Sequence, residues 1–297
     1  MTHDEFCALA KEYGFERVFF LAPERFELAE NPHHLVTDVC AEFPFASSIA
    51  ALVFPYAPFP DGERIPPYYL ASNAAYHGMK ALIKRLNELG IRAENADIPI
   101  RPALLRANIG AVLRTGFLSI APFGTRIVLM SIAVSELGPL GYELTEKTFC
   151  SGCRRCIDAC PAGAISESGV DYAVCHRSQM ETAAHPDAIR DCQSTYIGCE
   201  VCQRCCTMNA ALEKAEPSSE VLAAFDTERL IRGDASAARA LVGKNMTSNG
   251  KLTAEAIAFA ARDGLFSELI AEQAASPFEA VRDAVRYAKK LSRDDGA

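Results

Sequence analysis

Cysteine is the residue type whose number and spacing in this sequence point most directly to chemistry. The chain has 12 cysteines in 297 residues, and all but Cys7 and Cys40 lie between Cys150 and Cys206. A structural disulfide network would normally spread its cysteines across the fold, and no signal peptide is visible at the start of the sequence. This concentration of thiols therefore indicates metal binding.

The first group of thiols has the spacing of an iron–sulfur ligand motif. Cys150, Cys153, Cys156 and Cys160 form C-x2-C-x2-C-x3-C, and Pro161 follows. In this motif the first three thiolates bind different irons of one [4Fe–4S] cluster, and the fourth ligates the other cluster. Structural zinc usually takes two separated C-x2-C pairs and fits this run badly. The spacing therefore predicts two [4Fe–4S] clusters and electron transfer.

A second group of thiols completes the ligand sets, which for two clusters number about eight thiolates. The predicted ligands of the first cluster are Cys150, Cys153, Cys156 and Cys206. Those of the second cluster are Cys160, Cys175, Cys199 and Cys202. Two alternatives stay open, because Cys205 could replace Cys206 and Cys192 could replace Cys175.

The surrounding elements predict an α+β protein with three regions: an α/β domain over residues 1–144, a double-cluster domain over 145–209 and a helical segment over 210–297. Runs of β-branched and aromatic residues predict strands over 17–21, 48–54 and 126–134. Apolar residues at helical spacing predict a helix over 73–89 that ends before Gly90.

The last region is rich in Ala, Leu, Glu and Arg. It predicts helices over residues 251–261 and 277–291. Ser276 followed by Pro277 has the pattern of an N-cap and a first-turn proline.

Charge and apolar content argue against a nucleic-acid-binding or membrane-spanning protein. The formal charge of −8 argues against a general affinity for nucleic acid or anionic membranes. Apolar runs such as residues 127–134 are too short to span a bilayer, which takes about 20 residues. We therefore expect a cytoplasmic protein without a membrane partner.

Several stretches resemble epoxyqueuosine reductase, a cobalamin-dependent enzyme family of tRNA modification related to reductive dehalogenases. The upstream stretches that carry the resemblance are Glu12-Tyr-Gly-Phe-Glu-Arg-Val18, Ala46-Ser-Ser-Ile-Ala-Ala-Leu-Val-Phe-Pro-Tyr56, Ala71-Ser-Asn-Ala-Ala-Tyr76-His77, Arg101-Pro-Ala-Leu-Leu-Arg-Ala-Asn-Ile-Gly110 and Phe123-Gly-Thr-Arg-Ile-Val-Leu129. Within the thiol-rich region, Gly198-Cys-Glu-Val-Cys-Gln resembles the start of the family's GCDxCQxxCPxN, which favours Cys206 over Cys205. The family places an isolated cluster ligand at Cys175 and ends in a HEAT-like helical unit.

The resemblance implies a chemistry beyond the clusters. Electrons would pass through both clusters to a cobalamin held by the amino-terminal domain, near Tyr76 and His77, while a carboxylic acid donates a proton. The family has a catalytic Asp about seven residues before the position of Arg101. An ungapped alignment places Glu94 there, and Asp97 lies three residues nearer, so these two are the candidate proton donors.

The sequence also departs from the family. The motif GW-x-GK-N is replaced by Gly110-Ala-Val-Leu-Arg-Thr-Gly116, which removes a lysine and an aromatic from the implied site, and Thr207 replaces a proline. Residues 210–297 hold 12 Lys and Arg against 14 Asp and Glu, a net charge of −2. An RNA-binding surface is normally basic, so charge argues against tRNA as the substrate.

Two hypotheses follow. The first is an iron–sulfur oxidoreductase related to epoxyqueuosine reductase, with cobalamin as second cofactor and a redox partner protein as electron donor. The second is a ferredoxin-like electron-transfer protein without corrinoid that serves a partner. We also expect His176, the neighbour of Cys175, to lie at the surface.

Overall fold

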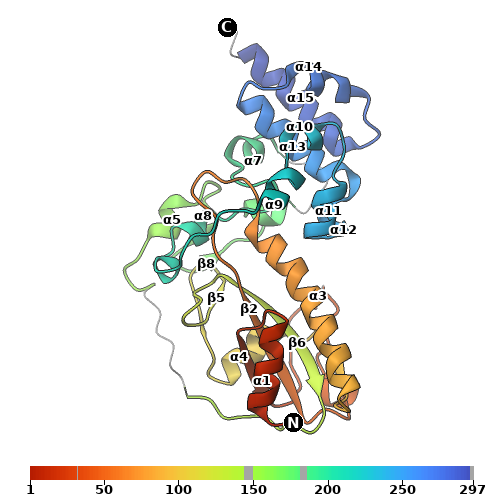
Figure 1. Cartoon of the computed structure of the whole chain (residues 1–297). Helices are drawn as coiled ribbons and strands as arrows, with labels where there is room; N and C mark the ends of the chain where they lie inside the picture. The colour runs from red at the N-terminus through yellow and green to blue at the C-terminus, as the bar shows by residue number, and fades with distance from the viewer. Residues whose placement is uncertain (32, 144–149, 181–185, 295–297) are drawn as a thin grey trace. The chain divides into compact units, whose positions relative to one another are not determined.

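The computed structural model describes residues 1–31, 33–143, 150–180 and 186–294 (Figure 1). The chain forms two compact units. The first comprises residues 1–56, 71–113 and 117–151, and the second comprises residues 57–70, 114–116 and 152–297. The predicted boundary between residues 144 and 145 lies outside the described residues, so the three-domain division stays a prediction.

The first unit is built on a four-stranded sheet with the strand order β1-β2-β6-β3, and each of its pairs is antiparallel. Its elements are α1 His3–Glu12, β1 Arg17–Leu21, α2 Val39–Glu42, β2 Ser48–Pro55, α3 Pro67–Glu88, β3 Ala93–Asn95, α4 Ile100–Arg106, β4 Ala111–Val112, β5 Leu118–Ser119 and β6 Ile127–Val134. Because its helices and antiparallel strands are mixed, the described fold is of the α+β kind that was predicted.

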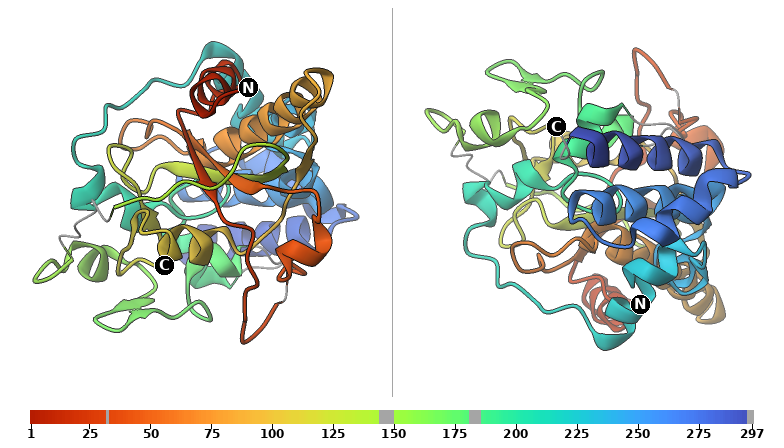
Figure 2. Two further views of the ribbon diagram at one scale, coloured as in Figure 1. Left: turned by 90° about the horizontal axis from the view of Figure 1, so that it is seen from below. Right: turned by 90° about the horizontal axis from the view of Figure 1, so that it is seen from above.

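Both faces of this sheet are buried. Successive side chains of a strand point to opposite faces, and on β1 the ring of Phe20 packs edge-on against Phe6 of α1 at 5.2 Å between centroids. Its neighbour Phe19 belongs to the opposite core, together with Leu104 of α4. Figure 2 (left) shows α1 and α3 on one side of the strands and α4 on the other.

The predicted elements of this unit are confirmed. Strands β1, β2 and β6 lie over the three predicted runs, with ends shifted by at most one residue. Helix α3 covers the predicted helix and begins earlier, at Pro67, because proline suits the first turn of a helix. The helix ends before Gly90, whose φ of +85° is left-handed and costs glycine little.

The second unit contains the cysteine-rich segment and the carboxyl-terminal helices. Its elements are α5 Arg155–Ala159, β7 Ile165–Ser166, β8 Gly169–Val170, α6 His176–Gln179, α7 Asp187–Cys192, α8 Val201–Arg204, η1 Thr207–Asn209, α9 Ser219–Ala224, α10 Thr227–Ile231, α11 Ser236–Val242, α12 Lys244–Thr247, η2 Ser248–Gly250, α13 Lys251–Arg262, α14 Ser267–Glu272, η3 Gln273–Ala275 and α15 Glu279–Asp294. The elements around the cysteines are short, as expected where metal rather than a core holds a segment.

The two predicted carboxyl-terminal helices are confirmed as α13 and α15, which pack along each other (Figure 2, right). The predicted cap of α15 is wrong. The helix begins at Glu279, and the Ser276 hydroxyl accepts a weak hydrogen bond from the Phe278 N–H at 3.4 Å. The chain needs residues 276–278 to turn from η3 into α15, so Ser276 lies too early to cap it. None of the helices within the described ranges is long and apolar enough to cross a membrane.

Candidate iron–sulfur centre

The first thiol motif wraps around the short helix α5. Gly152 allows the turn before it, with a φ of +74°. Cys156 lies in α5 and is buried, while Cys160 ends the helix with extended backbone at φ −69° and ψ 112°. The Ala164 N–H donates to Cys160 Sγ at 3.3 Å. The extended backbone at Cys160 therefore ends the helix that carries Cys156.

The second thiol motif is arranged around α8. Gly198 has a φ of +76°, and a Cβ atom there would lie 3.2 Å from the ring of Tyr69, so glycine suits this turn. Cys202 lies in α8, and Cys205 follows at its carboxyl end, where its thiol donates to the Cys202 carbonyl at 3.5 Å. Helices α5 and α8 pack against each other. The two motifs thus meet, although about 40 residues separate them along the chain.

The thiols form two groups by the charges that act on Cys199 and on Cys205, and the groups are linked because Cys205 also acts on Cys202. Burial, and then the negative charges of Cys175 and Cys160, raise the pKa of Cys199. Burial together with the charges of Cys199, Cys175, Cys205 and Cys160 also raises the pKa of Cys202. Cys160, Cys175, Cys199 and Cys202 are the four thiols predicted for the second cluster. Four thiolates this close to one another repel unless a cation lies between them, and iron supplies that charge, so this donor set fits a cluster.

The other group contains Cys153, Cys156 and both adjacent cysteines. Burial, and then the charges of Cys156 and Cys206, raise the pKa of Cys205 to about 11. The structure therefore brings Cys205 and Cys206 to the same group, and the choice between them stays open. No group of three or more His, Cys, Asp or Glu that could hold a metal ion occurs in the described part of the chain. In a [4Fe–4S] cluster the thiolates surround several irons rather than one ion.

The remaining alternative concerns Cys192. This residue ends α7 and is exposed, whereas Cys175 is only part-exposed and acts on Cys199 and Cys202. The geometry therefore favours Cys175 as the isolated ligand. The ligand assignment as a whole remains a prediction.

The expectation that His176 lies at the surface is wrong. His176 starts α6 directly after Cys175, and it is only 8% exposed. Burial lowers the pKa of this imidazole, so the neutral form prevails near pH 7. Its Nδ1 atom is buried without a hydrogen-bond partner among the described residues.

The carboxyl-terminal helices hold the segment that leads to Cys199. Arg262 of α13 donates to the carbonyl oxygens of Asp191 and Gln193, both at 2.9 Å. Tyr287 of α15 donates to the Asp191 carboxylate at 2.7 Å. These bonds tie the chain on either side of Cys192 to the carboxyl-terminal helices.

The candidate residues of the amino-terminal unit are more dispersed. Tyr76 and His77 lie on α3 with exposed side chains, and their rings are 5.5 Å apart. The Tyr76 hydroxyl accepts from Lys80 at 3.2 Å. Glu94 lies in β3 and accepts two hydrogen bonds from the Arg92 guanidinium, at 2.7 and 2.9 Å.

Asp97, the other candidate acid, lies in the loop after β3 with an exposed side chain. Apart from the pair of Tyr76 and His77, no contact in the described part of the chain joins the four candidates. The structure thus brings the cysteines together and leaves Tyr76, His77, Glu94 and Asp97 as separate predictions.

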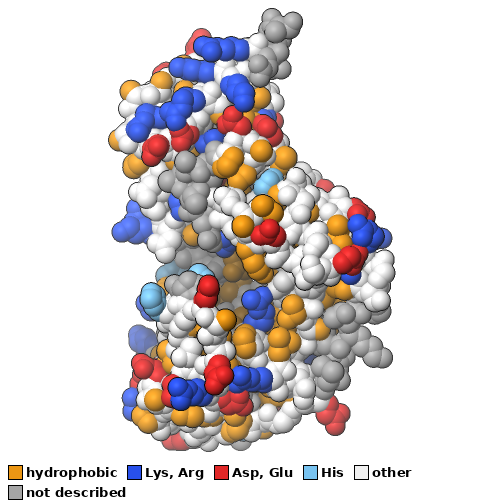
Figure 3. Space-filling model, turned by 180° about the vertical axis from the view of Figure 1, so that it is seen from behind, with side chains coloured by type: hydrophobic (Ala, Val, Ile, Leu, Met, Phe, Trp, Pro, Cys, Tyr) orange, Lys and Arg blue, Asp and Glu red, His pale blue; other side chains and the backbone are white. Residues whose placement is uncertain are grey.

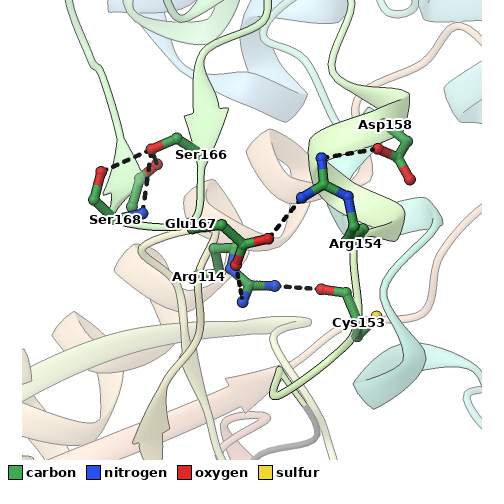
Figure 4. Close-up of polar contacts among 8 residues, drawn as sticks. Arg114, Cys153, Arg154, Asp158, Ser166, Glu167 and Ser168 are labelled. Carbon is green, nitrogen blue, oxygen red and sulfur yellow. Dashed lines mark hydrogen bonds and ion pairs between the residues drawn. The ribbon is translucent and has the colours of Figure 1, made fainter.

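One residue beside the cysteines was missed from the sequence. Arg114 donates to the carbonyl oxygen of Cys153 and forms an ion pair with Glu167 at 2.6 Å (Figure 4). It lies in the Gly110–Gly116 segment that departs from the family motif, at the place where that motif has lysine. The retained positive charge was the signal that could have identified it.

Comparison with known proteins supports the iron–sulfur reading. Residues 149–209 match the family model of the 4Fe-4S double cluster binding domain. Epoxyqueuosine reductase of Gloeobacter violaceus is 30% identical over 181 residues, which cover 55% of each chain. The Bacillus cereus enzyme is 26% identical over 48% of this chain and 39% of its own. The matches thus span about half or less of these relatives.

Solved structures show the same fold. The epoxyqueuosine reductase of Bacillus subtilis, with its catalytic Asp loop swung out of the active site, aligns at a TM-score of 0.76 and 18% identity, over 97% of this chain and 89% of that one. The Streptococcus thermophilus enzyme aligns at 0.70 and 15% identity, over 99% of both chains. A structure with an epoxyqueuosine-modified tRNA-Tyr stem loop aligns at 0.76 and 19% identity, over 97% and 89%. The predicted resemblance to epoxyqueuosine reductases is confirmed.

Proposed function

We propose that this protein is an iron–sulfur oxidoreductase that passes electrons through two [4Fe–4S] clusters to a cobalamin, as the resemblance to epoxyqueuosine reductase implies. The observation that supports the clusters is the meeting of Cys199 and Cys202 with Cys160 and Cys175, which come from distant parts of the chain. One cluster requires thiols brought close together from separate segments in this way.

A bound [4Fe–4S] cluster supplies a carrier of single electrons, and its potential depends on nearby charge and on hydrogen bonds to sulfur. This chain provides one such bond from the Ala164 N–H to Cys160 Sγ. The buried His176 imidazole offers a second donor beside Cys175, if its proton lies on Nδ1. The role of these groups is to hold the thiolates in place and to limit the access of water.

Cobalamin, when bound, would supply the redox-active metal for the reductive step. Tyr76 and His77 would hold it from α3, and Glu94 or Asp97 would hold the proton for the substrate. Asp97 lies in the loop after β3 with an exposed side chain. Glu94 is engaged with Arg92.

The substrate class to test first is a modified nucleoside of tRNA, since one relative of known structure was solved with such a stem loop. Surface charge opposes strong RNA binding. On the face shown in Figure 3, Lys and Arg of the carboxyl-terminal helices lie among Asp and Glu. On α15, Arg286 pairs with Asp283 and Lys290 pairs with Asp187. We therefore expect tRNA binding to be weak.

The test uses protein purified anaerobically with its clusters intact. Cobalamin is added, the excess is removed, and cobalt, iron and the visible spectrum are measured. Stoichiometric cobalt beside about eight irons supports the proposal. Reduction of an epoxyqueuosine-containing stem loop by this protein would then assign the substrate.

A second candidate is an electron carrier without corrinoid. It is favoured by the dispersal of the four candidate residues in the amino-terminal unit, in contrast to the grouped cysteines. It predicts about eight irons with no retained cobalt. A redox protein that binds the reduced chain and accepts its electrons would establish this alternative.

A further inference from the structure

Arg114 is held in a well-defined loop beside the cysteines. It follows β4, and the Leu113 N–H donates to the Phe117 carbonyl at 2.9 Å, which closes the turn. Gly116 in this turn has a φ of +76°, and a Cβ atom there would lie 2.5 Å from the Tyr172 hydroxyl oxygen. The left-handed backbone of this turn therefore favours glycine. The Arg114 side chain is only 13% exposed.

The guanidinium of Arg114 has two partners of different kinds (Figure 4). Nη1 donates to the backbone carbonyl of Cys153, and Nη2 pairs with Glu167 Oε2 at 2.6 Å. Glu167 also binds Arg154, from Nη1 to Oε1 at 2.7 Å, and Arg154 lies 3.6 Å from Asp158. Of these cations, Arg114 is the shielded one, since the Arg154 side chain is 55% exposed.

A positive charge beside a cluster ligand affects the reduction potential of the cluster when water does not screen it. Arginine stays protonated at any working pH. Reduction of a cluster adds one negative charge, and a nearby positive charge that water does not screen favours the reduced form. Glu167 offsets part of this effect. Arg155 is exposed on α5, so salt and water screen its charge much more.

We infer that Arg114 is a positioning residue of the iron–sulfur centre, which holds the Cys153 loop through its carbonyl and raises the reduction potential of the cluster bound there. This inference rests on the proposed function, because it requires that Cys153 ligates a cluster. Arg114 lies outside the cysteine motif, so the inference assigns a role to a residue that is not a ligand.

The test is a redox titration of the holoprotein followed by electron paramagnetic resonance. In Arg114→Gln, we expect the midpoint potential of one of the two clusters to fall. At the wild-type midpoint potential, the ratio of reduced to oxidised cluster should be about tenfold lower, which corresponds to a shift of about 59 mV for one electron. Arg114→Lys should keep more of the wild-type ratio, because it retains the charge. Arg155→Gln is the matched control and should shift the ratio less than Arg114→Gln does.

Glu167→Gln provides a second, independent variant with the opposite sign. It removes the offsetting negative charge from an exposed side chain, so the ratio should rise. If Arg114→Gln does not fold, the midpoint potential of Glu167→Gln tests the inference in its place. If the folded variants have full iron content and unchanged midpoint potentials, the inference is overturned, while the proposed function is not affected. A wild-type chain that binds no clusters would overturn the proposed function instead.

Discussion

Replacing Cys175 by serine tests which distant thiol completes the second cluster. Cys175 precedes α6 with extended backbone at φ −65° and ψ 123°, and its charge acts on both Cys199 and Cys202. Serine fills nearly the same space, but its hydroxyl is a poor ligand for iron. Without Cys175 the second cluster lacks its fourth thiolate, and the remaining three do not hold a cluster well.

The expected size of the effect is the loss of one whole cluster. Wild-type protein should hold about eight irons, and Cys175→Ser should hold about four. Iron and sulfide are measured after anaerobic reconstitution, together with the visible absorbance of the clusters. Cys192→Ser is the matched control, since it changes the same atom at an exposed thiol at the end of α7, and it should keep about eight irons.

The opposite pattern would refute this reasoning. If Cys192→Ser lost half of the iron while Cys175→Ser kept all of it, the grouping around Cys199 and Cys202 would not describe the cluster ligands. Circular dichroism of both variants shows whether the fold is retained. Because Cys175 is not part of the hydrophobic core, both variants should keep the wild-type helix content.

Three further predictions concern the second unit. The ring of Phe259 lies 4.4 Å from the guanidinium of Arg64, so Phe259→Leu should lower the free energy of unfolding by about 1–2 kcal/mol in chemical denaturation; no change would exclude this contact as stabilising. Arg64 also lowers the pKa of Asp263 below its usual 3.8, so this pair stabilises the fold above pH 3.8 and is lost as pH falls below it. Asp263→Asn should weaken that acid transition, and an unaltered pH profile would contradict the assignment. Finally, Cys206→Ser should lose one cluster while Cys205→Ser keeps both, and iron analysis that gives the reverse would assign Cys205 as the ligand.

Much of the fold could be predicted from local patterns. The runs around Phe19 and Ala51 are β-branched and apolar, and they form β1 and β2 because such side chains suit a buried strand. Helix α3 ends where Gly90 interrupts the apolar spacing. The start of α15 was misplaced, since Ser276 and Pro277 have the local form of a helix start whereas the preceding η3 makes the chain turn first.

The environment of single residues could not be predicted in the same way. His176 is polar and next to a ligand, which suggests exposure, yet tertiary packing buries it. The polar network of Asp191, Arg262 and Tyr287 joins segments far apart in the sequence, so it cannot be predicted from a local pattern.

The sequence by itself determined the kind of chemistry. Three thiols within seven residues stay close in space because the backbone between them is short, and their spacing is that of an iron–sulfur ligand motif. The tertiary structure decided which thiols meet across the chain. Packing of α5 against α8 brings Cys156 and Cys205 to one group, and Cys160, Cys175, Cys199 and Cys202 form the other. It also decided that Arg114 is the shielded charge beside Cys153, since burial depends on every segment that covers a side chain and not on its neighbours in sequence.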